Sequence, residues 1–173
     1  MDQRGAKQDQ ARPVETMLKE ARLRHVNRSD PVVVKPGTPM REVISLMQET
    51  QSGGVLVVGP SGGLSGIFTE RDYLDRFALG GGGAQGAPSL ETPIERFMTA
   101  SPRTLSPDHP LGDAIRWMIE GGYRHIPLVE DGGKVFGLVS AGDVVQFIAE
   151  YFPTEVYNLP PRLHQNIRTL DGG

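Results

Sequence analysis

The sequence predicts an α/β protein built from two β-α-β-β-α repeats. The first observation is a seven-residue phrase that occurs at 66–72 and again at 137–143. Each copy has a glycine, two apolar residues, a hydroxyl residue and, three residues later, an aspartate. The second observation is that a shift of 71 residues aligns positions 31–74 with the later chain without a gap, giving ten identities, where composition alone gives roughly three. Each copy is therefore one supersecondary unit that needs the other to complete its core.

The first repeat and its leading helix are expected at 14–79. Apolar residues at 14, 17, 18 and 21 follow the helical period, with Pro13 in the first turn. A short strand at 32–34 precedes a helix that Thr38 caps, with Pro39 at its first position. The run 55–58 lacks polar alternation, which favours a strand buried on both faces. A second strand at 64–68 leads into a helix that starts at Glu70 and ends near Leu79.

The second repeat is expected at 93–151. It begins at the capping box of Thr92 and Glu95, with a first strand at 103–105 and a helix whose apolar stripe starts at Leu111. A strand pair at 126–129 and 135–139 precedes a last helix at 141–151. The glycine-rich segment 80–92 reads as a flexible linker, 1–13 as a disordered N-terminal segment, and 152–173 as a C-terminal tail.

Composition limits the function classes. A net charge of −3 and a pI of about 5.8, without a basic cluster, argue against nucleic-acid binding. The absence of cysteine excludes disulfides and thiolate metal sites, and the scattered histidines lack metal-ligand spacing. The polar N-terminus predicts no signal peptide, and the apolar runs are too short to span a bilayer. We therefore expect a cytoplasmic protein that contacts no membrane and holds no metal.

One copy of the phrase is typical of an ordinary capped helix, but the order and doubling of several phrases carry more weight. A duplicated β-α-β-β-α unit that closes on glycine, two apolar residues, Ser or Thr, and Asp resembles the tandem CBS-domain pair, the Bateman module. Phe97-Met98-Thr99 and the run from Tyr123 to Val129 are also similar to phrases of that family. The resemblance covers roughly residues 14–150, and it implies two repeats packed around a pseudo-two-fold axis with two clefts for adenosine nucleotides.

The chemistry of the doubled phrase suits such a ligand, because a carboxylate accepts both hydrogen bonds of a ribose diol and a hydroxyl at a helix N-terminus meets a phosphate. The resemblance implies AMP, ADP or ATP as the ligand, with NAD(H) or S-adenosylmethionine as alternatives. In the second repeat it implies that Asp143 binds the ribose and Ser140 the ribose or a phosphate. The other residues implied for that cleft line the base slot or face the phosphates: Tyr123, Ile126, Pro127 and Thr104 for the base, and Arg124 and His125 for the phosphates.

In the first repeat the same roles fall to Asp72, Thr69, Val55 and Val33. There Gly53-Gly54 stands where the second repeat has Arg124-His125. The first cleft therefore lacks two phosphate donors, and the sequence favours the second cleft.

The preferred function is a regulatory module that senses an adenosine nucleotide and passes its ligand state to a target protein or to its own homodimer. The alternative is a dimerisation module with empty clefts. An enzyme is not expected, because Asp72 and Asp143 each start a helix without a neighbouring base or nucleophile. Repeat-helix residues are expected to contribute to a homodimer, and Trp117 to lie in the core or an interface rather than against a ligand: Met47, Trp117, Met118 and Phe147.

Overall fold

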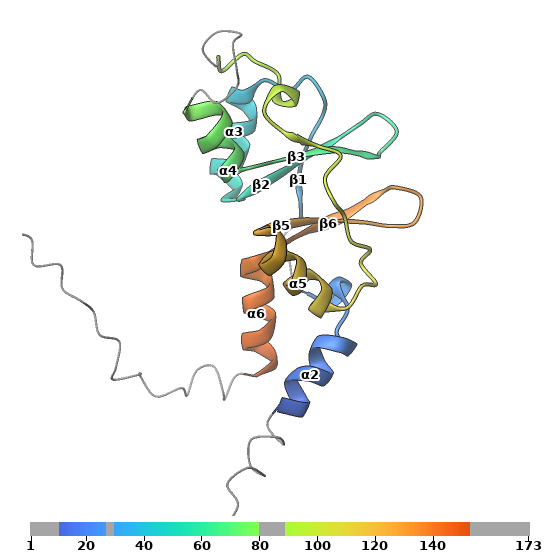
Figure 1. Cartoon of the computed structure of the whole chain (residues 1–173). Helices are drawn as coiled ribbons and strands as arrows, with labels where there is room; N and C mark the ends of the chain where they lie inside the picture. Colours follow the sequence, from blue (N-terminus) through green and yellow to red (C-terminus); the bar gives the residue numbers. More distant parts are fainter. Residues whose placement is uncertain (1–10, 27–29, 80–88, 153–173) are drawn as a thin grey trace, which may run out of the picture.

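The computed structural model describes residues 11–26, 30–79 and 89–152. Figure 1 shows two bodies, each a small sheet covered by helices, with the two sheets facing each other. A small apolar cluster of Leu56, Ile67 and Leu138 lies between them. Because Ile67 and Leu138 are equivalent under the 71-residue shift, the repeats meet about a pseudo-two-fold axis, which confirms the predicted fold class.

The first repeat carries a four-stranded sheet in the order β1-β2-β3-β4. Its elements are β1 (Val32–Val34), α3 (Met40–Thr50), β2 (Gly54–Val58), β3 (Leu64–Thr69) and α4 (Glu70–Asp72). Strand β1 runs parallel to β2, and β2 antiparallel to β3. After α4 the helix widens into a π-helix at Tyr73–Ala78, and β4 (Thr99–Ala100) pairs with β3 from the segment ahead of the second repeat.

The second repeat contains α5 (Leu111–Gly121), β5 (His125–Val129), β6 (Val135–Ser140) and α6 (Ala141–Tyr151). The prediction of a strand at 103–105 is wrong, because only Leu105 forms a parallel bridge, to Leu128. A longer parallel ladder needs an N–H donor at Pro127, and proline has none. At the equivalent position the first repeat has Leu56, and there the three-residue β1 forms.

The leading segments of the two repeats are exchanged. The sequence predicts that the leading helix belongs to the first repeat; the structure has there helix α2 (Ala11–Glu20) and the 3-10 turn Leu23–His25. In the structure they pack on the second, where Met17, Leu23 and Val26 join its core, and Figure 1 shows α2 against α5. Conversely, Ile94 and Phe97, ahead of the second repeat, lie in the core of the first.

Backbone hydrogen bonds repeat this exchange with the same spacing. The amide of Ile94 donates to Thr38 at 2.9 Å, and that of Leu23 donates to His109 at 3.1 Å. Leu23 lies 71 positions before Ile94, and His109 lies 71 positions after Thr38, so the two bonds are equivalent in the duplication. Each repeat is therefore completed by a segment that lies next to the other repeat in the sequence.

Several boundaries differ from the prediction. Helix α2 starts at Ala11, inside the segment expected to be disordered, and residues 1–10 lie outside the described part. Neither predicted threonine cap forms, since Pro39 and Pro93 occupy the cap positions without side-chain bonds and the Thr38 hydroxyl donates to Lys35. Most of the predicted linker, at 80–88, and the tail from 153 onward also lie outside the described part. Within the ranges that the structure describes, no helix is long and apolar enough to cross a membrane.

Candidate functional site

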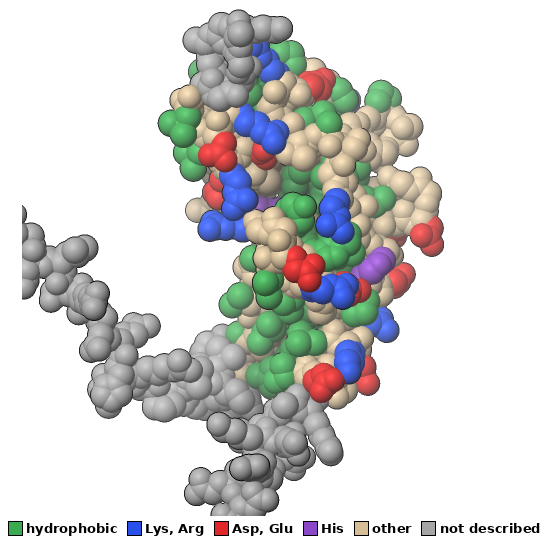
Figure 2. Space-filling view, in the orientation of Figure 1, with side chains coloured by type: hydrophobic (Ala, Val, Ile, Leu, Met, Phe, Trp, Pro, Cys, Tyr) green, Lys and Arg blue, Asp and Glu red, His purple; other side chains and the backbone are tan. Residues whose placement is uncertain are grey.

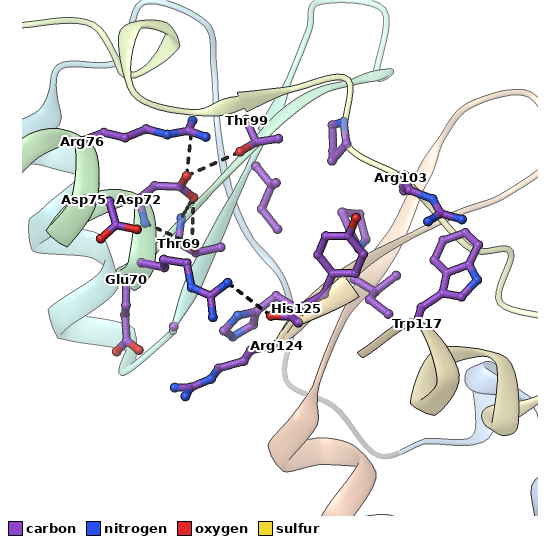
Figure 3. A pocket seen from close by; sticks show the side chains of 18 of the residues that line it. Thr69, Glu70, Asp72, Asp75, Arg76, Thr99, Arg103, Trp117, Arg124 and His125 are labelled. Atoms are coloured by element: carbon purple, nitrogen blue, oxygen red, sulfur yellow. Dashed lines mark hydrogen bonds and ion pairs between the residues drawn. The ribbon is translucent and has the colours of Figure 1, made fainter. Parts of the chain in front are cut away.

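A cavity of about 720 Å³ lies where the helix start of the first repeat faces the β5 edge of the second. Figure 3 shows its walls, with Thr69 and Asp72 on one side and Trp117 and Arg103 on the other. Its lining contains residues from both repeats and from the connecting segment, the described residues 89–103 between them. From the first repeat come Gly53, Ile67, Thr69, Glu70, Arg71, Asp72, Leu74, Asp75 and Arg76; the rest are Thr99, Ser101, Pro102, Arg103, Trp117, Gly122, Tyr123, Arg124, His125, Ile126 and Pro127.

The carboxylate of Asp72 is the most deeply placed charge of this cavity, at 9% exposure. Its Oδ2 accepts hydrogen bonds from the backbone N–H and the hydroxyl of Thr69, at 3.0 and 2.7 Å. The bond from the Thr69 N–H, together with a 3.4 Å bond from the Asp72 N–H to Thr69 Oγ1, forms a capping box, which a strand ending in threonine before a helix favours. Its Oδ1 has only longer contacts, to Thr99 Oγ1 at 3.4 Å and to a guanidinium nitrogen of Arg76 at 3.3 Å. Oδ1 is therefore the more weakly engaged of the two carboxylate oxygens.

Arg76 ties this carboxylate to the connecting segment. Its guanidinium donates to the carbonyl oxygens of Phe97 and Met98, at 3.1 and 2.9 Å, and pairs with Asp72. The equivalent position in the second repeat is Phe147, so Asp143 has no such arginine four residues after it. The two halves of the duplication are therefore chemically unequal at their carboxylates.

The second repeat supplies the opposite wall. Ile126 and Pro127 are buried, while Tyr123 and Arg124 are exposed at the rim. The guanidinium of Arg71 reaches across from the first repeat and donates to the carbonyl of Gly122 at 3.3 Å. This bond links the two repeats at the cavity.

The ring of His125 accounts for the glycine at position 53. A Cβ at Gly53 would lie 2.9 Å from both Cε1 and Nε2 of His125, and one at Gly54 would lie 3.6 Å from the ring. A side chain at Gly53 would therefore overlap the imidazole. The sequence suggests that these glycines replace phosphate donors in the first repeat; in the structure Gly53 also packs against a histidine of the second.

Burial lowers the pKa of His125, and Arg124 acts in the same direction, while the carboxylates of Glu70 and Asp143 oppose the shift. The folded protein therefore holds the imidazole neutral at a pH where the unfolded chain, with a pKa near 6.5, binds a proton. The stability that this residue contributes is fully present above about pH 6.5 and is lost as the pH falls from there through the lower folded pKa.

We expect the melting temperature of wild type to fall more steeply between about pH 7.5 and 5.5 than that of His125→Gln, which cannot titrate. Thermal melts of both proteins across this range measure the two slopes. Equal slopes would show that His125 is not held neutral by its surroundings.

The cavity brings together seven of the residues expected from the sequence and leaves out five. Those that line it are Thr69, Asp72, Tyr123, Arg124, His125, Ile126 and Pro127. The lining does not include Thr104, Val33, Val55, Ser140 or Asp143. Val55 is fully buried in the core of the first repeat, and Val33 and Thr104 are exposed.

The grouping differs from the sequence expectation. The sequence combined Tyr123 through Pro127 with the carboxylate of their own repeat, whereas the cavity combines them with Asp72 of the other. The physical reason is the packing of the repeats about the pseudo-two-fold axis, which sets β5 of one against the helix start of the other. Asp143 instead forms the capping box of α6, accepting from the backbone N–H of Ser140 at 2.7 Å.

Sequence reasoning missed several lining residues, foremost Thr99, Arg103 and Trp117. The sequence predicts Arg103 in a strand and Trp117 in the core or an interface. Trp117 does pack against the core of the second repeat, and it also borders the cavity. A signal for Thr99 existed, because it closes a phrase shared with the family, but its place beside Asp72 is a tertiary contact. Among the residues that the structure describes, no group of His, Asp and Glu has the arrangement of a metal site.

Comparisons with known proteins agree with this architecture. The family profile of the CBS domain matches residues 23–79 and 94–150. The chain is 29% identical over 118 residues to a 17.7 kDa protein of Acidianus ambivalens, covering 68% of this chain and 67% of that protein. It is 32% identical over 122 residues to the mitochondrial CBS domain-containing protein CBSX3 of Arabidopsis thaliana, covering 68% of this chain and 56% of the relative. The alignments thus span between 56% and 67% of these curated relatives' own lengths.

Among solved structures, CBSX2 in complex with AMP superimposes with a TM-score of 0.63. The two are 25% identical, and the match covers 75% of this chain and 97% of that chain.

Proposed function

Because the chain belongs to the CBS-domain family and carries two such domains in tandem, we propose that it is a regulatory module that binds an adenosine-containing nucleotide between its repeats. The observation that carries the proposal is the cavity in which Asp72 and Thr69 of one repeat face Tyr123 through Pro127 of the other. A carboxylate with a weakly engaged oxygen, an apolar wall and an arginine at the rim are the groups that ribose, adenine and phosphate require.

Each part of the ligand has a counterpart. Asp72 Oδ1 accepts the ribose hydroxyls, while Ile126 and Pro127 provide the apolar wall for the base. Arg124 lines the cavity and, among the described residues, has no ion-pair partner, so it is available to a phosphate. The AMP complex of CBSX2, a neighbour with the same fold, supports a ligand of this class.

We propose one such site per chain, which is a finer claim than the pair of clefts expected from the sequence. At the positions equivalent to Arg124 and His125 the first repeat has Gly53 and Gly54, which supply no cation, and the ring of His125 packs against Gly53. A regulatory role, rather than a catalytic one, is supported by the capping boxes of Asp72 and Asp143, since each carboxylate already stabilises a helix start.

Binding of a nucleotide changes how the two repeats are held together, and this change transmits the ligand state. A nucleotide held by Asp72 on one side and Arg124 on the other bridges both bodies, as the bond from Arg71 to Gly122 does without ligand. A target protein or a second copy of the chain then binds differently, because the angle between the repeats has changed. For a homodimer, α5 and α6 supply exposed apolar side chains, among them Ile119 at 77% and Val145 at 66%; Figure 2 shows hydrophobic side chains over these helices.

Thermal melting in the presence of AMP, ATP, NADH and S-adenosylmethionine tests the proposal. A ligand at about 100 times its dissociation constant adds roughly 2.7 kcal/mol of stability, which raises the melting temperature of a domain of this size by several degrees. At least one of the four is expected to do so. Unchanged melting with all four, together with a dimeric mass in light scattering of the same samples, would favour the alternative, an interaction module without ligand.

A further inference from the structure

Helix α5 ends at the cavity in a turn of two glycines followed by a tyrosine. Gly121 is the last helical residue, Gly122 follows in the left-handed conformation with a φ of 64°, and Tyr123 lines the cavity. The guanidinium of Arg71, from the first repeat, donates to the carbonyl of Gly122 at 3.3 Å. This turn is therefore held at the place where the two repeats meet.

The ring of Tyr123 lies directly on the backbone of Gly121. A Cβ at Gly121 would lie 2.1 Å from Cε2 of the tyrosine, 2.6 Å from Cδ2 and 2.7 Å from Cζ. Because the two neighbours of Cε2 in the ring are little farther away than Cε2 itself, this Cβ would stand over the face of the ring. Two carbons in ordinary contact are about 3.5–4.0 Å apart. No residue but glycine therefore fits at position 121 while the ring keeps this place.

The backbone gives no other reason for this glycine. Gly121 is helical and, in contrast to Gly122, does not have a positive φ. Alanine is the better residue for such a position, since glycine costs a helix about 1 kcal/mol relative to alanine. The contact with the ring, rather than the conformation of the chain, accounts for the glycine.

The duplication shows the same relation in its other copy. Seventy-one residues earlier stand Thr50, Gln51 and Ser52. Gln51 ends helix α3 in the left-handed conformation, with a φ of 52°, so both repeats make the same backbone turn. The first repeat has a threonine where the residue two positions later is a small serine. The second has glycine at that position, where the residue two positions later is Tyr123, which indicates that position 121 is small to admit the ring.

We propose that Gly121 is a positioning residue of the nucleotide site, because it leaves the space in which the ring of Tyr123 forms a wall of the cavity. Gly121 does not itself line the cavity, so it acts through the tyrosine. A Cβ at Gly121 displaces the ring from that wall, since Tyr123 is 40% exposed and can turn to another rotamer. This inference rests on the proposed function and adds to it a residue that the ligand does not touch.

Calorimetric titration of wild type, Gly121→Ala, Tyr123→Ser and the double variant with AMP and ATP tests this role. Gly121→Ala and Tyr123→Ser are each expected to weaken nucleotide binding about 3- to 10-fold, as the loss of one aromatic contact implies. Once Tyr123→Ser is present, adding Gly121→Ala is expected to change the affinity by less than about twofold, because the contact it disturbs is already gone. The melting temperature of Gly121→Ala is expected to equal or exceed that of wild type, because alanine favours the helix.

Proton NMR gives a measurement that needs no ligand. The ring current of Tyr123 is expected to shift an Hα resonance of Gly121 upfield in wild type, and Tyr123→Ser is expected to remove this shift. Equal nucleotide affinity of wild type and Gly121→Ala, or an equal effect of Gly121→Ala with and without the tyrosine, overturns the positioning role but leaves the proposed function standing. Failure of both nucleotides to bind wild type overturns both.

Discussion

Phe97→Ala is expected to lower the free energy of unfolding by about 3–5 kcal/mol, the range for truncating a buried phenylalanine. Phe97 is fully buried in the core of the first repeat with Val34, Val55 and Phe68. Its ring also meets that of Phe77 edge to face, with centroids 5.1 Å apart. The large effect is notable because Phe97 precedes the second repeat in the sequence, and its loss opens a cavity in the first.

Leu90→Ala is the matched control. Leu90 belongs to the same connecting segment but is 51% exposed, so its truncation is expected to change stability by about 0.5 kcal/mol or less. Urea unfolding of both variants, followed by far-UV circular dichroism, gives the two free energies. If Phe97→Ala were no more destabilising than Leu90→Ala, the exchange of leading segments would be contradicted.

The sequence predicts most of the elements, because each is a local pattern repeated twice. The helix starts at Thr69 and Ser140 show the expected capping boxes, and β2 is buried along most of its length, as its unbroken apolar run indicates. The missing strand at 103–105 was also within reach of the sequence, since Pro127 stands where the first repeat has Leu56. Proline has no backbone N–H, so position 127 cannot donate the hydrogen bond that a strand at 103–105 needs.

The exchange of segments and the composition of the cavity were not predictable in the same way. Leu23 and Ile94 look like ordinary apolar residues next to their own repeats, and only the tertiary hydrogen bonds to His109 and Thr38 reveal which core they enter. Likewise, the ring of His125, a residue 72 positions away in the sequence, leaves no space for a side chain at Gly53. Contacts between distant segments decide both features, and a local pattern carries no information about them.

The second large effect is expected at Asp72. Asp72→Asn preserves the size of the side chain but removes the charge that accepts the ribose hydroxyls. A loss of about 2–3 kcal/mol, or roughly 30- to 150-fold in nucleotide affinity, is expected. Sequence reasoning alone favours the opposite ranking, in which Asp143 matters more, because it grouped Asp143 with Arg124 and His125.

Asp143→Asn is a closely matched control for this change. Asp143 forms the same capping box with Ser140 that Asp72 forms with Thr69, so both variants weaken a helix start, and Asp72→Asn also weakens the ion pair with Arg76. Asp72 lines the cavity and Asp143 does not. Melting temperatures of the two variants separate the effect on the helix from the effect on binding.

The most direct test of a single nucleotide site built across the two repeats is calorimetric titration of wild type, Asp72→Asn and Asp143→Asn with AMP and ATP. Wild type is expected to bind one nucleotide per chain. Asp143→Asn is expected to bind with affinity within about twofold of wild type, and Asp72→Asn to lose at least about 30-fold. Full affinity in folded Asp72→Asn, with binding lost in Asp143→Asn, would contradict the assignment and move the ligand to the other side of the pseudo-two-fold axis.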